Sequence, residues 1–351
     1  MPDAPFEKPK RRLRYSGSHP RQFHEKYKEL NPERYAEDVA KIIASGKTPA
    51  GMHRPIMVRE ILEVLAPRPG EVAVDATLGY GGHAIELLKA VLPGGKLLAL
   101  DVDPIELPKT EMRLRGMDFP AEALLVRRSN FAGLSRVLTA ESIPGADVLL
   151  ADLGLSSMQI DDPSRGFTFK RSGPLDLRMN PQRGQPALAF LASLDAPELA
   201  QLLEANADEP HAQTLARAIV AKQQHTPITT TTALAETIGE TLRSSPSGLG
   251  GQDFDESIRR VFQALRIAVN DEFGALDTFL RLLPGCLKPG GRVAMLTFHS
   301  GEDRRVKQAF KDGVRAGKYS RIAEGVVRPG ADELRANPRS SSAKLRWAVR
   351  S

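Results

Sequence analysis

Short apolar runs alternate with longer segments of helical spacing over the first half of the chain. Four of these runs lack the polar alternation of a half-exposed strand: Val72–Asp75, Gly95–Asp101, Ala123–Phe131 and Asp147–Asp152. Residues 53–65, 84–91 and 108–115 carry apolar positions at helical spacing and precede or separate the runs. Non-alternating strands joined by helices are typical of a parallel sheet covered on both faces. The pattern therefore predicts an α/β fold.

The alternation stops after residue 159. A glycine-punctuated loop covers residues 166–178, and residues 186–242 are rich in Ala and Leu and predict helices. Residues 254–283 predict one long amphipathic helix or two, and the turn at 287–291 leads into a fifth strand at 292–300. A last strand is expected within 340–350. The simplest organisation is a helical insertion between the fourth and fifth strands. It gives four parts: a basic N-terminal extension at 1–50, a first sheet segment at 51–159, the insertion at 160–253, and a second sheet segment at 254–351.

A glycine-rich turn follows the first predicted strand, in Asp75-Ala-Thr-Leu-Gly-Tyr-Gly-Gly-His83. Glycines at such a turn let the backbone approach a ligand, although a plain tight turn is the alternative for Gly81 and Gly82. Asp101 ends the second strand, where an acid commonly holds ribose hydroxyls. The turn reads G-x-G-G and lacks the third glycine of the dinucleotide fingerprint. This favours another adenosine cofactor, S-adenosylmethionine, over NAD.

The net charge of +6 is unevenly distributed. Residues 1–50 carry 11 Lys and Arg against 7 acids, and residues 292–351 carry 14 against 6, whereas residues 51–291 carry 24 against 30. Basic ends on an acidic body suit a polyanionic partner such as nucleic acid, with solubility as the alternative. The single cysteine, Cys286, fits a small core residue and a reducing compartment. The absence of a 20-residue apolar run or secretory signal predicts a cytoplasmic protein without a membrane span.

Taken together, these segments resemble the bacterial small-subunit ribosomal RNA cytosine-N4 methyltransferase family. The segments that carry the resemblance are His53-x-Pro-Ile, Asp75–His83, Leu100–Pro104, Ser129–Phe131, Asp152-Leu-Gly-Leu-Ser-Ser-Met-Gln159, Asp162-Pro-Ser-Arg-Gly-Phe-Thr-Phe169, Gly173–Met179, Arg183-Gly184, Ala216–Val220, Val261-Phe-Gln-Ala-Leu-Arg-Ile-Ala-Val-Asn270, Phe298–Ser300 and Glu302–Arg304. They cover about residues 53–350. The resemblance implies a class I S-adenosylmethionine-dependent methyltransferase, with a Rossmann-like sheet that carries an inserted helical domain, acting on ribosomal RNA or the small ribosomal subunit.

The resemblance also implies roles for individual residues in binding the cofactor. Gly81, Gly82 and His83 would form the cofactor turn, with a helix-cap contact as the alternative for His83. Asp101 would accept the ribose hydroxyls. The remaining contacts would come from Phe131 and Asp152, which would flank the adenine or methionine part, and from Gln159.

Asp152 is also the predicted catalytic residue. The amino group of cytosine is a poor nucleophile, so transfer benefits from an acceptor for its N–H bonds. However, Asp152-Leu-Gly-Leu-Ser-Ser lacks the Pro-Pro-aromatic run of many amino methyltransferases. The predicted RNA contacts are Arg165, Phe167, Phe169, Arg178 and His299; for the two rings, anchoring their loop in the core is the alternative, and for the arginines, an ordinary solvated surface. No Cys/His cluster indicates a metal.

Two segments depart from the family pattern. A Tyr-Gly-Glu-Glu-Arg type segment is replaced by Asn206-Ala-Asp-Glu-Pro-His211, and a His-Pro-Ala-Thr-Arg type segment by Phe254-Asp-Glu-Ser-Ile-Arg-Arg260. Both lie in or beside the insertion, the side expected to face the RNA substrate, and this leaves the target nucleotide open. The alternatives left open are a diverged paralogue that methylates another RNA, a non-catalytic assembly factor with this fold, and a nicotinamide oxidoreductase. The sequence also leaves a homodimer open.

Overall fold

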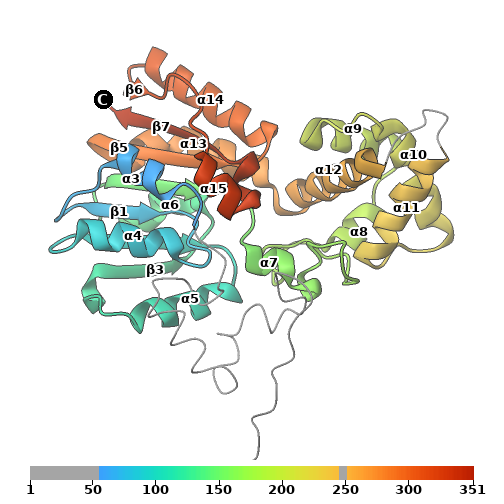
Figure 1. Cartoon of the computed structure of the whole chain (residues 1–351), viewed down its shortest axis with the longest axis horizontal. Helices are drawn as coiled ribbons and strands as arrows, with labels where there is room; N and C mark the ends of the chain where they lie inside the picture. The colour runs from blue at the N-terminus through green and yellow to red at the C-terminus, as the bar shows by residue number, and fades with distance from the viewer. Residues whose placement is uncertain (1–54, 245–250) are drawn as a thin grey trace, which may run out of the picture. The chain divides into compact units, whose positions relative to one another are not determined.

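The computed structural model describes residues 55–244 and 251–351, with the side chains of 251–253 excepted. Its centre is one seven-stranded sheet with the order β3-β2-β1-β4-β5-β7-β6 (Figure 1). The strands are β1 Val72–Asp75, β2 Lys96–Asp101, β3 Leu124–Arg128, β4 Ala146–Asp152, β5 Leu287–Thr297, β6 Tyr319–Ile322 and β7 Lys344–Arg350. The first five are parallel, and β7 runs antiparallel between β5 and β6.

The strand order reverses beside β1, which pairs with β2 on one side and with β4 on the other. Ligands of open α/β sheets bind outside the carboxyl ends of the strands at such a switch point. β1, β2 and β4 each end in aspartate, at Asp75, Asp101 and Asp152. The sheet order therefore brings three acids to the edge where a ligand is expected.

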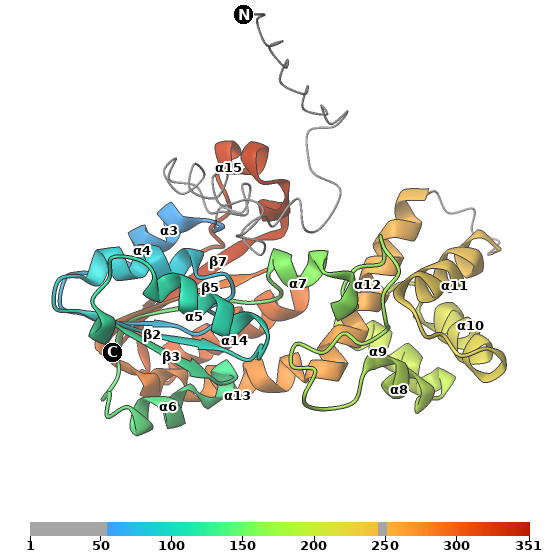
Figure 2. The same cartoon turned by 90° about the horizontal axis from the view of Figure 1, so that it is seen from below.

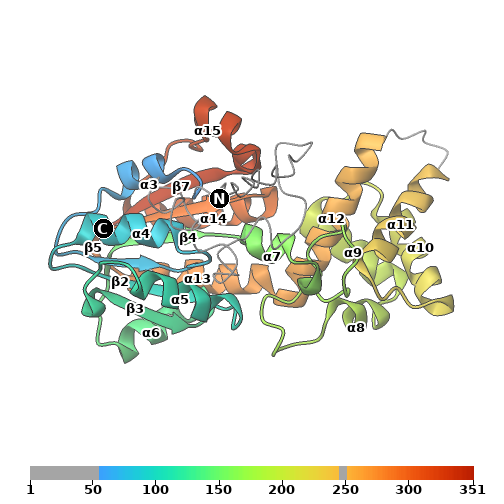
Figure 3. The same ribbon diagram turned by 60° about the horizontal axis from the view of Figure 1, so that its bottom comes forward.

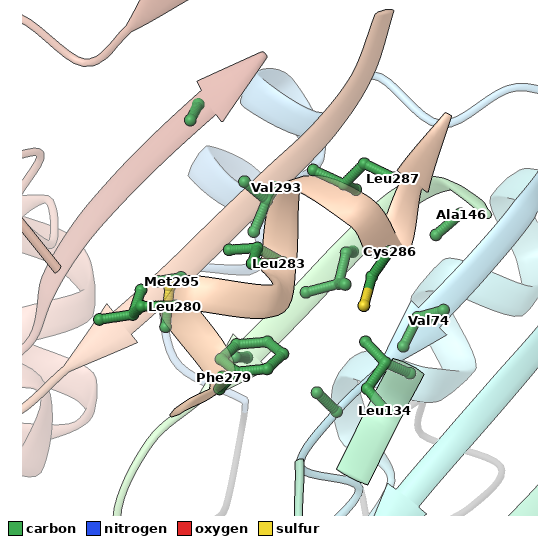
Figure 4. Packing of buried hydrophobic residues seen from close by; sticks show 14 of the residues in the cluster. Val74, Leu134, Ala146, Phe279, Leu280, Leu283, Cys286, Leu287, Val293 and Met295 are labelled. Carbon is green, nitrogen blue, oxygen red and sulfur yellow. The ribbon is translucent and has the colours of Figure 1, made fainter. Parts of the chain in front are cut away.

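Helices cover both faces of the sheet, and Figure 2 shows α3 and α4 on one side and α6 and α13 on the other. The first face carries α3 Val58–Leu65, α4 Gly82–Val91 and α5 Glu106–Arg115. The second face carries α6 Leu134–Ala140, α13 Glu272–Cys286 and α14 Ser300–Arg315. Cys286 packs in that second cluster against Leu283 and Leu134 (Figure 4). Cys286 is 1% exposed, which confirms the prediction of a core residue, and burial raises the pKa of its thiol to about 11.

A second group of helices follows β4. After α7 Ser157–Asp161 come α8 Ala187–Ala192, α9 Ala196–Ala207, α10 Ala212–His225, α11 Thr231–Arg243 and α12 Gly251–Asn270 (Figure 3). The last five share one apolar cluster, to which α12 contributes Val261, Phe262 and Leu265. The packing of this cluster therefore continues past residue 253, where the sequence predicted the insertion to end, because α12 presents its apolar face to the other helices.

The predicted strands and helices agree with the structure in their order and nearly in their bounds. The segment 254–283 forms two helices, broken at Asp271, whose φ is +49°. The turn at 287–291 is an irregularity inside β5, where pairing steps from Leu287 directly to Arg292. β6 and the short helices α6, α7 and α15 Ala331–Ala336 were not predicted. The prediction for residues 1–50 lies outside the described residues. Within them, no helix is long and apolar enough to cross a membrane.

Candidate active site

The loops that leave β1 and β4 are tied together at the carboxyl edge of the sheet. The backbone N–H of Asp152 donates to the Thr77 hydroxyl at 2.7 Å, and the N–H of Thr77 donates to Asp75 Oδ1 at 3.1 Å. The N–H of Ala76 donates to the carbonyl of Leu150 at 2.9 Å. Thr77 therefore fixes Asp152 relative to the first strand. No role was predicted for Thr77, although its position two residues after the aspartate that ends β1 could have indicated one.

Asp101 holds the glycine turn from the neighbouring strand. Its Oδ2 accepts from the N–H of Gly79 at 2.7 Å, and its Oδ1 accepts from the N–H of Asp103 at 2.9 Å. Burial raises the pKa of this carboxyl, and the two backbone donors counter that rise. Each carboxylate oxygen keeps a second lone pair, so a ribose contact remains compatible with this geometry.

Gly81 is required by its backbone angle and by its surroundings, and Gly82 by its surroundings. Gly81 has a φ of +76°, and a Cβ there would lie 3.1 Å from Thr110 Cγ2 and 3.3 Å from Leu114 Cδ1. A Cβ on Gly82 would meet the Pro55 ring at 3.0 Å. These contacts show that the turn is packed closely against α5 and the segment before α3, which leaves the opposite side of its backbone for a ligand.

We expect Gly81→Ala to lower the free energy of unfolding by about 1–3 kcal/mol, because it combines a left-handed backbone with crowding. Gly70→Ala is the matched control, since Gly70 has a φ of +85° and no atom within 4 Å of an added Cβ. Denaturant unfolding of both variants measures the difference. Equal losses would show that crowding against α5 contributes nothing.

His83 and Asp152 face each other across the same edge. His83 Nε2 lies 3.5 Å from Asp152 Oδ2, without hydrogen-bond geometry. His83 Nε2 and Asp152 Oδ1 are both shielded from solvent and have no hydrogen-bond partner among the described residues. Unpaired buried polar atoms are costly and rare, and they commonly mark a site where a ligand or substrate completes the bonding.

Gln159 and Arg165 meet at Asp103, two residues after the end of β2. The Oδ1 of Asp103 accepts from the N–H groups of Ile105 and Glu106 at the start of α5. Its Oδ2 accepts from Gln159 Nε2 at 2.7 Å and from Arg165 Nη1 at 2.8 Å. The side chains of Arg165 and Asp103 are only 6% and 1% exposed. This buried ion pair joins the end of β2 to the loop after α7.

The buried position of Arg165 does not support the RNA contact that the sequence predicted for it. Arg165 Nη2 donates inward, to the carbonyl oxygens of Arg178 and Met179. The Gln159 amide is likewise engaged, because its Oε1 accepts from the N–H of Ser156 in a capping box at the start of α7. Both residues support the walls of the site through bonds within the chain.

Phe131 packs edge-on against Phe279 with ring centroids 5.3 Å apart. It follows β3 after Ser129 and Asn130 and is half-buried, and its ring packs against the core of the second face. The predicted cofactor contact of Phe131 stays a prediction, and the structure assigns this ring a packing role as well.

The other predicted RNA contacts also have partners within the chain. Phe167 is buried, and Phe169 packs against Phe262 with ring centroids 5.4 Å apart. Arg178 forms a two-bond ion pair with Asp176, at 2.8 and 2.7 Å. The packing thus favours the alternative in which the two rings anchor their loop in the core.

His299 belongs to a cluster with Glu302 and Glu272 whose ligand atoms lie within 4.8 Å of one another. Arg266 donates to both oxygens of Glu272, at 2.7 and 2.9 Å, and the N–H of Phe298 donates to Glu302 Oε2 at 2.8 Å. Hydrogen bonds and the charges of His299 and Arg266 hold the pKa of Glu302 below its usual range. Arg266 already supplies the positive charge that a metal would bring, so the geometry describes an ion-pair network behind the end of β5.

The two segments that depart from the family pattern contact each other. The Ser257 hydroxyl donates to Glu209 Oε1 at 2.9 Å, and both residues are 2% exposed. Next to them, Asp208 accepts from the Ser300 hydroxyl at 2.9 Å and pairs with Arg304 at 3.0 Å. Residues 206–211 therefore connect α12 to the start of α14, beside the end of β5.

The residues at this edge fit an adenosine cofactor that carries an amino-acid chain. Asp101 and Asp152 offer acceptors suited to hydroxyl and ammonium groups, and Asp152 Oδ1 is unpaired among the described residues. The backbone is open at Gly79 and Gly154, where an added Cβ would come no closer than 3.9 and 3.7 Å to another atom. The sheet order, the glycine turn and the acid at the end of β2 define a class I S-adenosylmethionine-dependent methyltransferase.

The family model of the MraW methylase family matches residues 50–351, and the chain belongs to that family. A relative from Alkaliphilus metalliredigens, named ribosomal RNA small subunit methyltransferase H 2, is 50% identical and covers 98% of each chain. One from Lachnoclostridium phytofermentans, named ribosomal RNA small subunit methyltransferase H 1, is 49% identical over 97% of this chain and 93% of its own. One from Acidothermus cellulolyticus, named ribosomal RNA small subunit methyltransferase H, is 38% identical over 87% of this chain and 95% of its own.

Proposed function

We propose that this methyltransferase methylates the N4 amino group of a cytidine in small-subunit ribosomal RNA, with Asp152 at the reacting nitrogen. Family membership and the names of the relatives support the reaction and the RNA. The observation that carries the residue assignment is Asp152 Oδ1, an acceptor without a partner among the described residues, held at the carboxyl end of β4 by Thr77. Such an acceptor suits the N–H of an exocyclic amino group.

The chain's task in this reaction is positioning, because a methyl group moves in line between sulfur and nitrogen. When bound, S-adenosylmethionine supplies an electrophilic methyl group on a sulfonium. The Gly81-Gly82 turn and Asp101 would hold the adenosine half, and His83 would lie beside the methionine half. Asp152 Oδ1 would accept an N4–H, which directs the nitrogen lone pair and stabilises the charge that develops on that nitrogen. The target cytosine has to leave its stack to reach this edge.

Transfer of labelled methyl groups to small-subunit RNA, followed by nucleoside analysis, tests the function directly. N4-methylated cytidine is the expected product. Label on another base or on ribose would overturn the proposed acceptor, and binding of the cofactor without transfer to any RNA substrate would favour the assembly factor. Purified RNA and small-subunit particles should both be used, since the sequence leaves the form of the substrate open.

A diverged paralogue that methylates another RNA is the second candidate. The observation behind it is the buried Ser257–Glu209 bond, which joins the two segments that depart from the family pattern. The RNA transfer experiment separates the candidates when total cellular RNA is included. A cytoplasmic location and a homodimer stay predictions.

The exposed basic residues of the loop after α7 are better placed for phosphate contacts than the buried Arg165. Lys170, Arg171 and Arg183 are exposed on the segment that carries Phe167 and Phe169. We expect Lys170→Ala/Arg171→Ala to weaken RNA binding and to reduce the slope of log affinity against log salt by about 1–2. Lys222→Ala, at an exposed site on α10, is the control. An unchanged salt slope would exclude these side chains as phosphate contacts.

A further inference from the structure

Asp75 is a buried carboxylate for which the proposed function gives no role. It ends β1 between β2 and β4, is 1% exposed, and accepts one hydrogen bond among the described residues, from the N–H of Thr77. His83, in the first turn of α4, is the strongest favourable charge near it, and Asp152 and Asp101 are the acids that oppose its ionisation. A buried acid costs stability unless it is paired, so a carboxyl kept here indicates a functional use.

His83 lies beside Asp152 at the carboxyl edge of the sheet. Its Nε2 is 3.5 Å from Asp152 Oδ2 and has no hydrogen-bond partner among the described residues. The imidazole side chain is 9% exposed, so bulk water is a poor proton acceptor at this point. Asp75 ends β1, the strand next to the one that Asp152 ends, and the charge of His83 acts on its carboxyl.

We propose that His83 takes up the proton released at the cytosine amino group through Asp152, and that Asp75 stabilises the resulting imidazolium. This inference deepens the proposed function and rests on it. His83 and Asp75 would be positioning residues for the proton, whereas Asp152 is the group that touches the substrate.

The proton inventory balances. As the N4 lone pair forms the new N–C bond, the electrons of the S–C bond remain on sulfur, and N4 becomes positively charged. One N4–H bond then breaks, its electron pair returns to nitrogen, and the proton moves to the Asp152 carboxylate. From Asp152 it passes to the lone pair of His83 Nε2, which restores the carboxylate. After the product leaves, the imidazolium loses the proton to solvent.

The charges around Asp75 suit this exchange. Burial raises the pKa of the Asp75 carboxyl to about 7, and the charges of Asp152 and Asp101 add to that rise, whereas His83 lowers it. That value of about 7 already includes the favourable charge of His83, so without a positive charge on His83 the Asp75 anion would form only at still higher pH. The anion and the imidazolium therefore favour each other, as a proton acceptor beside Asp152 requires.

The test is the pH profile of single-turnover methyl transfer, with cofactor and RNA saturating. We expect the wild-type rate to fall as the pH is lowered, because a protonated imidazole has no lone pair with which to take up the proton. His83→Gln should lower the plateau about 10- to 100-fold and remove that part of the decline. Asp75→Asn should move the decline to lower pH, because the imidazolium loses its anionic neighbour. His225→Gln, at an exposed site on α10, is the control.

A structural role for His83 would lower the rate equally at every pH. If His83→Gln and Asp75→Asn both keep the wild-type profile, the inference is overturned while the proposed function stands. If the wild-type protein transfers no methyl group to cytidine N4, the proposed function itself fails. Cofactor affinity measured for each variant shows whether saturation was reached. Should Asp75→Asn fail to fold, His83→Asn provides the second profile.

Discussion

Asp152→Asn is expected to lower the single-turnover rate of methyl transfer about 10²- to 10⁴-fold with little change in fold. The substitution keeps the shape of the side chain but replaces a charged acceptor by a neutral amide, and losses of this size are typical when a catalytic proton acceptor is removed. The fold should persist because the side chain makes no hydrogen bond within the described part of the chain. The backbone N–H that donates to Thr77 is retained. Rapid quench of labelled transfer at saturating cofactor measures the effect.

Asp118→Asn is the matched control for that variant, because Asp118 is an exposed carboxylate on the loop before β3. Its rate should equal the wild-type rate. Cofactor affinity of Asp152→Asn, measured by calorimetry, separates lost binding from lost chemistry. A variant that binds the cofactor and still transfers at the wild-type rate would show that Asp152 is not the acceptor for N4–H.

The part of the fold that positions the cofactor was predictable because its determinants are local. Buried parallel strands consist of continuous apolar runs that can be recognised in the sequence. In each of β1, β2 and β4 the run ends in an aspartate. Gly81 carries its own signal, since a left-handed turn beside a helix start tolerates few other residues. The class of methyltransferase follows from these strand ends.

The side chains predicted to contact RNA were harder to interpret, because burial depends on residues far away in sequence. Arg165 lies 62 residues after Asp103, and Phe169 meets Phe262, which belongs to a helix assigned to the second sheet segment. An arginine in a polar loop has the same local pattern whether it faces solvent or an internal carboxylate. The sequence offered the core alternative for the two rings, and their packing favours it.

The two segments that depart from the family pattern also form a contact that the sequence alone did not reveal. Glu209 and Ser257 are 48 residues apart and were noted separately, yet they form one buried hydrogen bond. Glu209 Oε2 is buried and has no hydrogen-bond partner among the described residues. The sequence of a single chain does not reveal that two distant segments contact each other, because that contact forms only in the folded structure. Residues 206–211 also contact Ser300 and Arg304, so a change in the insertion reaches the end of β5.

Arg165→Met is expected to produce the largest loss of stability, about 3–5 kcal/mol, because it leaves the Asp103 carboxylate charged and buried without its partner. Methionine keeps much of the side-chain volume, so the loss reports on charge and hydrogen bonding. Arg127→Met is the control, since Arg127 pairs with Glu141 at 2.6 Å but is 44% exposed. Exposed pairs contribute at most about 1 kcal/mol. Denaturant unfolding monitored by circular dichroism measures both losses.

The same variant decides between the two roles considered for Arg165. A phosphate contact would appear as weaker RNA binding with a smaller salt slope and unchanged unfolding. A structural ion pair would lower the unfolding midpoint and affect RNA binding only as far as the loop after α7 moves. The geometry favours the second result, because the three hydrogen-bond acceptors of Arg165, Asp103 and the carbonyls of Arg178 and Met179, lie within the chain. If Arg165→Met unfolds with the same free energy as the wild type, Arg165 is not part of a structural ion pair and the RNA contact is the better account.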